Sequence, residues 1–204
     1  MPKLILLRLY KKIMSPRVSS VRIVGGKFKG LKVPYKTSPH IRPTSNKNRE
    51  TLFNWLMYDI DGAVCLDLFA GTGALGLEAI SRGAKFVYFT EKNKKICSKI
   101  KQTITRLDVV HQTEIINTDS LGFSFQSRIK HSVDIIFIDP PFRKGLMKKV
   151  FKKIKEQKII SNNSIIYAEM EKEKEIEIEE IILDWNLIKS KTSGQTRYCL
   201  FKSK

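Results

Sequence analysis

The chain has 204 residues, of which 42% are hydrophobic and 28% charged, and it carries a net charge of +18 with a pI near 9.9. The length suits one α/β domain with a small appendage, and the composition is that of a soluble globular protein rather than a disordered one. The excess of positive charge predicts an anionic partner, with nucleic acid first and an acidic membrane surface second. Residues 1–60 account for +11 of this net charge. A general bias toward lysine would spread the charge more evenly along the chain.

The first twenty residues are basic, with five Lys or Arg and no acidic side chain. Their apolar run, Leu4–Leu9, is too short to span a bilayer, and it lacks the small-residue cleavage site of a secretory signal. Four interpretations fit this segment: an organelle presequence, a helix on a membrane surface, a basic extension that contacts RNA, and a poorly ordered tail.

Residues 21–60 predict a small β element followed by a helix. The segments VRIV and LKV alternate apolar and polar residues on either side of a glycine-rich turn, which predicts two short strands. A loop over 34–43 follows, and Thr44 or Ser45 then caps a helix with an apolar face over 52–56. The basic side chains of the β element are Arg22, Lys27, Lys29 and Lys32.

From residue 63 onward, segments typical of buried strands alternate with helical ones, and this alternation predicts a doubly wound, mostly parallel sheet. The predicted strands are 63–69, 85–91, 113–119, 133–139 and 163–170. The predicted helices are 74–83, 93–106 and a segment through Leu146, Val150 and Ile154. The acidic stretch 169–180 predicts a solvated strand edge or loop. The last stretch, 185–201, predicts an antiparallel hairpin that turns near Ser193 and Gly194.

A glycine-rich loop links the first of these strands to the first of these helices. Gly71, Gly73 and Gly76 form a G-x-G-x-x-G pattern, in which the missing Cβ atoms let the backbone approach a ligand. Glu91 ends the next strand, twenty residues after the first glycine, where a carboxylate can accept hydrogen bonds from both hydroxyls of a ribose. These residues fit a dinucleotide and S-adenosylmethionine equally well.

Two further acids favour S-adenosylmethionine. Asp67 lies four residues before the first glycine, where its charge would repel a pyrophosphate but suits a ligand with a cationic amino-acid end. Asp119 ends the third predicted strand and can accept a hydrogen bond from an adenine amino group. Strand-end acids also cap helices, but capping explains one such residue more readily than three.

The fourth predicted strand ends in Asp139-Pro140-Pro141-Phe142. Proline cannot donate to a sheet ladder, so the strand must stop there, and Asp-Pro also opens ordinary turns. Following a glycine loop at the right strand, however, DPPF resembles the [DNS]-P-P-[YFW] motif of amino-methyltransferases that use S-adenosylmethionine.

A narrower resemblance covers nearly all of the chain from Val21. The stretches RIVGGKFKGLKV, RPTSNKNRETLFNWL, CLDLFAGTGALGLEAISRGA, DPPF and GQTRY are similar to those of the bacterial 16S rRNA (guanine-2-amino) methyltransferases of the RsmD family. The second stretch is the most specific of them. It departs from the family at Asn46-Lys47-Asn48, where the family usually has Asp-Arg-Val, and residues 1–20 lie outside the family pattern.

This resemblance implies a Rossmann-like class I methyltransferase with a final antiparallel hairpin. Its implied reaction places one methyl group on the exocyclic 2-amino group of a specific guanine in 16S rRNA, within an assembled or assembling small ribosomal subunit. The expected organisation is a basic extension (1–20), a small RNA-binding β-hairpin and helix (21–60), and a methyltransferase domain (61–204). We expect a cytoplasmic monomer without membrane attachment. The cysteines and histidines lack metal-ligand spacing, so we also expect no metal.

The expected site residues fall into three groups. Those for the cofactor S-adenosylmethionine are Asp67, Phe69, Gly71, Gly73, Glu91, Asp119 and Ser120. Those for catalysis are Asp139, Pro140 and Phe142. Those for RNA binding are Arg22, Lys27, Lys29, Arg42, Thr44, Lys47, Arg49 and Arg143. Arg49 has a second interpretation, in which it pairs with Glu50 at the start of the helix.

In the expected mechanism the Asp139 carboxylate and the Pro140 carbonyl accept hydrogen bonds from the guanine amino group and direct its lone pair at the methyl group, while Phe142 stacks on the extruded base. Other hypotheses are an amino-methyltransferase of DNA adenine or protein glutamine, a nicotinamide dehydrogenase, and a non-catalytic ribosome-assembly factor. The lack of a separate target-recognition domain argues against DNA. A dehydrogenase has no use for DPPF, and an intact Asp139 argues against loss of catalysis.

Overall fold

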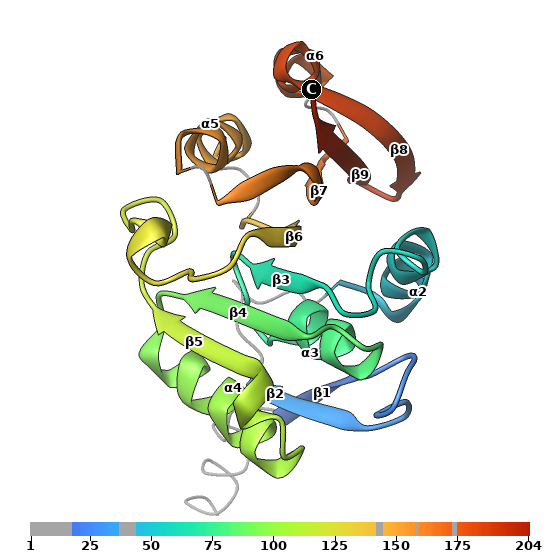
Figure 1. Cartoon of the computed structure of the whole chain (residues 1–204). Helices are drawn as coiled ribbons and strands as arrows, with labels where there is room; N and C mark the ends of the chain where they lie inside the picture. Colours follow the sequence, from blue (N-terminus) through green and yellow to red (C-terminus); the bar gives the residue numbers. More distant parts are fainter. Residues whose placement is uncertain (1–17, 37–43, 142–144, 158, 173–174) are drawn as a thin grey trace, which may run out of the picture.

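The computed structural model describes residues 18–36, 44–141, 145–157, 159–172 and 175–204 (Figure 1). At its centre is a seven-stranded sheet with the order β5-β4-β3-β6-β7-β9-β8. Strands β3 to β7 pair in parallel, and β9 pairs antiparallel with both β7 and β8. The predicted doubly wound, mostly parallel sheet with an antiparallel C-terminal hairpin is therefore confirmed.

The strands of this sheet are β3 (Val64–Asp67), β4 (Phe86–Glu91), β5 (Thr113–Asn117), β6 (Val133–Ile138), β7 (Ile160–Glu171), β8 (Trp185–Ser193) and β9 (Thr196–Ser203). A separate two-stranded sheet consists of β1 (Val18–Arg22) and β2 (Lys32–Lys36). The helices are α2 (Asn46–Trp55), α3 (Ala74–Ser81), α4 (Lys94–Arg106), α5 (Met147–Gln157) and α6 (Glu175–Asp184), with 3-10 turns η1 (Val110–Gln112) and η2 (Phe125–Ser127). Of the two predicted N-caps of α2, Thr44 and Ser45, the structure has Ser45, whose side chain accepts a hydrogen bond from the Asn48 amide.

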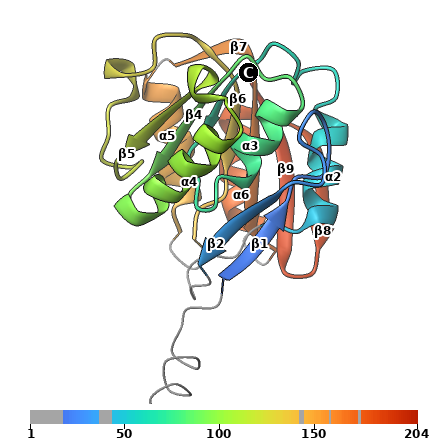
Figure 2. The same ribbon diagram turned by 90° about the horizontal axis from the view of Figure 1, so that it is seen from below.

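Helices cover both faces of the sheet, which explains why β3, β4 and β6 are buried along most of their length (Figure 2). One hydrophobic core lies between the sheet and α2, α3 and α4, and it also takes in Ile23 and Val33 from the β1–β2 element. The other core lies between the sheet and α5 and α6. The β1–β2 element therefore packs on the same side of the sheet as α3 and α4.

A buried carboxylate fixes the β1–β2 element to this side. Glu78 of α3 accepts hydrogen bonds from the backbone amides of Val24 (2.8 Å) and Gly25 (2.7 Å) and forms ion pairs with Arg49 (3.3 Å) and Arg82 (2.9 Å). The Glu78 and Arg49 side chains are fully buried. Three segments that are distant in sequence thus meet at one side chain.

The turn between β1 and β2 packs on the C-terminal end of α3. The Lys27 amide donates to the Ser81 carbonyl (2.7 Å), and the Ser81 hydroxyl donates to the Gly25 carbonyl (2.5 Å). A Cβ atom on Gly26, whose φ is +72°, would lie 1.8 Å from the Ser81 oxygen, so no larger residue fits there without moving the backbone.

The prediction for the acidic stretch 169–180 is wrong. Strand β7 extends to Glu171, and α6 begins at Glu175. Ile178 and Ile181 of α6 are 5% and 3% exposed and belong to the second core. The dense run of acidic residues concealed this short apolar face, which in the described side chains of the helix consists of Ile178 and Ile181.

Candidate active site

The glycine loop follows β3 at the carboxyl edge of the parallel strands. Gly71 and Gly73 have φ values of +50° and +74°, in the left-handed region that favours glycine. Gly76 lies in the first turn of α3, and a Cβ atom there would come within 2.2 Å of the Phe89 ring. The first two glycines therefore shape the loop, and the third allows close packing of α3 on β4.

Glu91 is half-buried and ends β4 beside this loop. One oxygen of its carboxylate accepts a hydrogen bond from the Gly71 amide (3.1 Å) and the other accepts one from the Asn93 amide (2.8 Å). The structure thus brings together the loop and the strand-end acid that the sequence placed twenty residues apart.

Asp67 and Ser120 lie beneath the loop rather than on its surface. Asp67 is 2% exposed and its carboxylate accepts a hydrogen bond from the Gly76 amide (3.1 Å). Burial raises the pKa of Asp67 to about 7, against the lowering effect of that hydrogen bond. Ser120 is 4% exposed and donates to the Leu68 carbonyl (2.5 Å). In this structure both side chains hold the backbone around the loop in place, and their direct contact with the cofactor stays a prediction.

The other two predicted cofactor residues lie nearer the surface. Phe69 is half-buried and packs against the second core. Asp119 is exposed and accepts a hydrogen bond from the Leu121 amide (3.0 Å). It stands two residues past the end of β5 at Asn117, so the strand is shorter than predicted although the acid remains at the same edge of the sheet.

Asp139 follows the last residue of β6 at the same edge. It is half-buried, and Pro140 behind it is buried. The Thr44 hydroxyl lies 3.5 Å from the Asp139 carboxylate. Burial raises the pKa of Asp139 well above its ordinary value, and the charges of Glu169 and Asp67 raise it further. Phe142, the third predicted catalytic residue, lies outside the described residues.

A second buried acid stands beside Asp139, and the sequence analysis missed it. Glu169 of β7 is 5% exposed and accepts hydrogen bonds from the hydroxyls of Thr44 (2.6 Å) and Tyr167 (3.0 Å). Because Ile138 pairs with Ala168 in the parallel register, Asp139 and Glu169 are the next residues on neighbouring strands. The sequence does contain a signal for this residue, because an acidic side chain within the otherwise apolar segment IIYAEM indicates a buried carboxylate with a partner.

Two of the residues predicted to contact RNA are buried. Arg49 is 0% exposed, forms an ion pair with Glu78, and donates to the Arg22 carbonyl (2.6 Å), so it stabilises the fold and does not reach a phosphate. It does not pair with Glu50, which was the second interpretation. Thr44 is 8% exposed and faces the two acids described above, so it too is not placed to bind phosphate.

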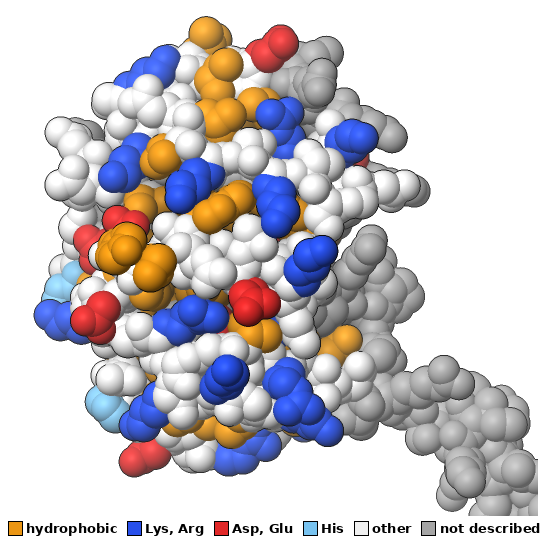
Figure 3. Space-filling model, turned by 90° about the vertical axis from the view of Figure 1, so that its right-hand side faces the viewer, with side chains coloured by type: hydrophobic (Ala, Val, Ile, Leu, Met, Phe, Trp, Pro, Cys, Tyr) orange, Lys and Arg blue, Asp and Glu red, His pale blue; other side chains and the backbone are white. Residues whose placement is uncertain are grey.

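The remaining predicted RNA contacts are exposed but dispersed. Lys47 lies in the first turn of α2, close in sequence to Thr44, whereas Lys27 and Lys29 lie in the turn packed on the far end of α3. Arg22 is exposed at the end of β1. Figure 3 shows the side of the molecule that carries α2 and β8, where Lys and Arg side chains are widely spread and acidic ones are fewer. Arg42 and Arg143 lie outside the described residues.

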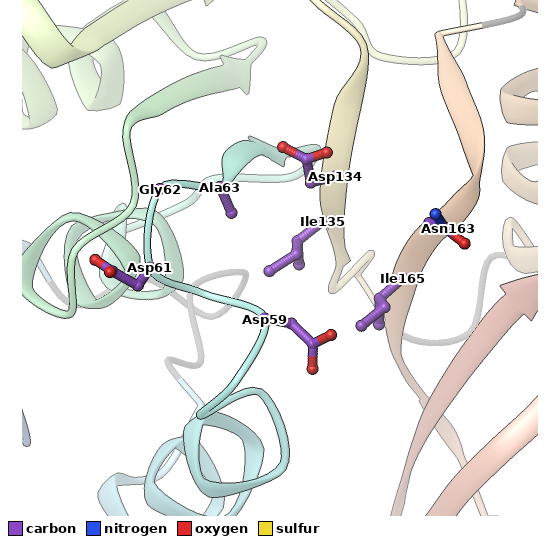
Figure 4. Close-up of a pocket in the computed structure, with 8 residues that line it drawn as sticks. All are labelled: Asp59, Asp61, Gly62, Ala63, Asp134, Ile135, Asn163 and Ile165. Carbon is purple, nitrogen blue, oxygen red and sulfur yellow. The ribbon is translucent and has the colours of Figure 1, made fainter.

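A cavity of about 240 Å³ opens at the opposite end of the sheet (Figure 4). Asp59, Asp61 and Asp134 contribute to its lining, but their carboxylates point in different directions, and Asp134 accepts a hydrogen bond from the Val64 amide (2.8 Å). Across the described residues, no three His, Cys, Asp or Glu side chains are grouped as a metal site would require. None of the helices described is long and apolar enough to cross a bilayer.

Comparisons with known proteins match the chain over most of its length. The sequence profile of a family described as "Conserved hypothetical protein 95" matches residues 21–202. Ribosomal RNA small subunit methyltransferase D of Haemophilus influenzae is 40% identical, over 95% of this chain and 100% of that protein. The protein of the same name from Escherichia coli K12 is 36% identical, over 89% of both chains. Among solved structures, a putative methyltransferase of Escherichia coli superposes with a TM-score of 0.78 at 32% identity, covering 91% of this chain and 99% of that one.

Proposed function

Since this chain belongs to the family of ribosomal RNA small subunit methyltransferase D, we propose that it methylates the exocyclic 2-amino group of a specific guanine in 16S rRNA. The family makes the chain an rRNA methyltransferase; the choice of guanine and of its 2-amino group is the proposal. We further propose that it acts as a cytoplasmic monomer on an assembled or assembling small subunit.

One observation carries the proposal: the acid of DPPF and the glycine loop lie on adjacent strands at one edge of the sheet. β3 and β6 are hydrogen-bonded neighbours, with Asp67 paired to Phe137. Asp139 therefore lies two residues beyond that pair, on the strand next to the one that leads into Gly71. In an open parallel sheet, ligands bind at the carboxyl ends of the strands, which is where these groups lie.

The loop fits S-adenosylmethionine, which supplies an electrophilic methyl group on a sulfonium when it is bound. Gly71 and Gly73 present backbone without a Cβ atom, and Glu91 and Asp119 offer carboxylate acceptors at the ends of β4 and β5. Acceptors suit the ribose hydroxyls and the adenine amino group of this cofactor. The buried Asp67 carboxylate stabilises the start of α3, directly after the loop, by accepting a hydrogen bond from the Gly76 amide.

The DPPF segment supplies acceptors for the nucleophile. A guanine amino group is a weak nucleophile because its lone pair is delocalised into the ring. The Asp139 carboxylate and the Pro140 carbonyl would accept hydrogen bonds from its two N–H groups and hold the nitrogen in one orientation. Proline restricts the backbone at positions 140 and 141, so the carbonyl stays fixed. Phe142 would stack on the base once it leaves the helix.

The decisive experiment uses small ribosomal subunits from cells that lack the corresponding gene. These subunits are incubated with the purified chain and S-adenosylmethionine labelled on the methyl group, and the labelled nucleotide is then mapped. We expect one labelled guanine, carrying the label on its 2-amino nitrogen. Label on adenine, or on a ring nitrogen of guanine, would contradict the proposed specificity, and no label on rRNA would contradict the activity.

Exposed lysines on the β1–β2 element and α2 should contribute to RNA affinity through phosphate contacts. We expect Lys47→Ala to make the negative slope of log K against log salt shallower by about 0.7–0.9, and the double variant Lys27→Ala with Lys29→Ala by up to about 2. Each phosphate contact that is lost reduces the number of counterions released when RNA binds. Binding of small subunits is measured at several salt concentrations. Lys130→Ala, an exposed lysine before the amino end of β6, is the control and should leave the slope unchanged. Equal slopes for Lys47→Ala and the unmodified chain would contradict a phosphate contact there.

A further inference from the structure

We propose that Asp139, Thr44 and Glu169 form one hydroxyl-bridged unit in which two carboxyl groups share a single proton, and that Glu169 is a positioning residue which acts on methyl transfer through Asp139. The role in transfer depends on the function proposed above for Asp139. The sharing of the proton is a property of the protein alone and is testable without rRNA.

The geometry joins the two acids through one side chain. Thr44 stands just before α2, and its hydroxyl donates to Glu169 Oε1 at 2.6 Å while lying 3.5 Å from Asp139 Oδ2. A hydroxyl has one hydrogen to donate and lone pairs with which to accept. Thr44 can therefore donate to whichever of the two acids is ionised and accept from the one that is protonated, so the bridge forms with the proton on either Asp139 or Glu169. Tyr167 donates to the same Glu169 oxygen (3.0 Å) and so holds the second carboxyl group in place.

Within the described part of the chain, the titratable groups that act on the pair are acids and neutral hydroxyls. Tyr167 of β7 donates to Glu169 and stacks on Tyr198 of β9, and the charge of Asp67 at the end of β3 raises the pKa of Asp139. Among the described residues, neither Asp139 nor Glu169 forms an ion pair with a Lys or Arg. Two adjacent carboxylates, one half-buried and the other buried, repel each other strongly when no described Lys or Arg compensates their charge, and we infer that the pair retains one proton. Burial raises the pKa of both acids, in agreement with this geometry.

A shared proton suits the chemistry assigned to Asp139. Before transfer, Asp139 must be the ionised member, because it accepts a hydrogen bond from the amino group. Glu169 then holds the proton. After transfer, the methylated nitrogen carries one proton too many and gives it to the Asp139 carboxylate. The pair then holds two protons and returns one to solvent as the product leaves.

The first test is a ¹³C NMR titration of the carboxyl groups in the protein without ligands. In the unmodified chain the Asp139 signal should titrate above the ordinary value for aspartate, about 3.9. In Glu169→Gln its midpoint should fall by on the order of one pH unit, because a neutral amide replaces the competing acid. The Gln oxygen can still accept from Thr44 and Tyr167, so this variant keeps the local hydrogen bonds. An unchanged midpoint would overturn the inference, whether or not the chain methylates rRNA.

The second test concerns the bridge and uses methyl transfer to small subunits. Thr44→Val removes the hydroxyl and should lower kcat about tenfold with little change in KM, whereas Thr44→Ser retains the hydroxyl and should restore most of the rate. The acid limb of the pH–rate profile of Glu169→Gln should move to lower pH, in parallel with the NMR midpoint. Equal rates for the Ser and Val variants at equal thermal stability would overturn the bridging role of Thr44.

Discussion

Asp139→Ala should reduce methyl transfer by about 10²–10³-fold or more while leaving S-adenosylmethionine binding intact. The loss is expected because the carboxylate interacts with the reacting nitrogen, and groups of this kind contribute mainly to the transition state. Cofactor affinity should persist because the glycine loop and Glu91 make their hydrogen bonds without Asp139. Transfer is measured as labelled methyl on small subunits, and cofactor binding by calorimetry.

Asp59→Ala is a suitable control for that experiment. Asp59 is an exposed aspartate beside the cavity at the other end of the sheet, and its removal should leave the rate unchanged. A normal rate in Asp139→Ala would exclude the mechanism derived for the DPPF segment. A loss of cofactor binding in Asp139→Ala would instead show that this residue belongs to the cofactor site.

Glu78→Ala should be the most destabilising single substitution of a charged residue in the described fold, at about 3–5 kcal/mol. It would leave the Arg49 guanidinium buried without its carboxylate and would orphan the amides of Val24 and Gly25. Burial already lowers the pKa of Arg49, and its Nε atom has no hydrogen-bond partner in the structure. The guanidinium therefore depends on Glu78 for compensation of its charge.

The measurement for Glu78→Ala is the free energy of unfolding in urea, at unchanged m value. Glu114→Ala provides a matched control, since Glu114 pairs with Arg128 on the surface (2.5 Å) and its loss should change stability by less than about 1 kcal/mol. A similar small effect for both substitutions would show that the buried network does not hold the β1–β2 element to α3.

The local patterns that predicted the fold were those with a short-range physical cause. Ser45 caps α2 because its side chain reaches an amide three residues ahead, and β6 is apolar at every position except Asp134 because both of its faces are covered. The helix α6 was missed because its buried face consists of Ile178 and Ile181 amid many acidic residues. Local patterning alone favoured a solvated strand edge or loop there.

The site was predictable to the extent that it depends on residues close to a motif. The glycine loop, Glu91 and Asp139 were found because each lies at or just after the end of a strand, and parallel strands bring their carboxyl ends together. Arg49 was assigned to RNA because a charged side chain is usually exposed, and the sequence does not reveal that Glu78, 29 positions away, meets it in the interior. Glu169 was missed for the same reason, since its neighbour Thr44 is 125 residues distant.

Helix α3 is occupied at both of its ends, and this has a consequence for how a target base is chosen. One end begins at the glycine loop, and the other holds the turn between β1 and β2 through Ser81 and Gly26. The helix spans eight residues, or about 12 Å, and is packed on the sheet. On the proposed function, with phosphates held by Lys27 and Lys29, this helix would set the separation between those phosphates and the methyl donor. A guanine would then be selected by the distance at which the folded rRNA presents it, as well as by its own chemical groups.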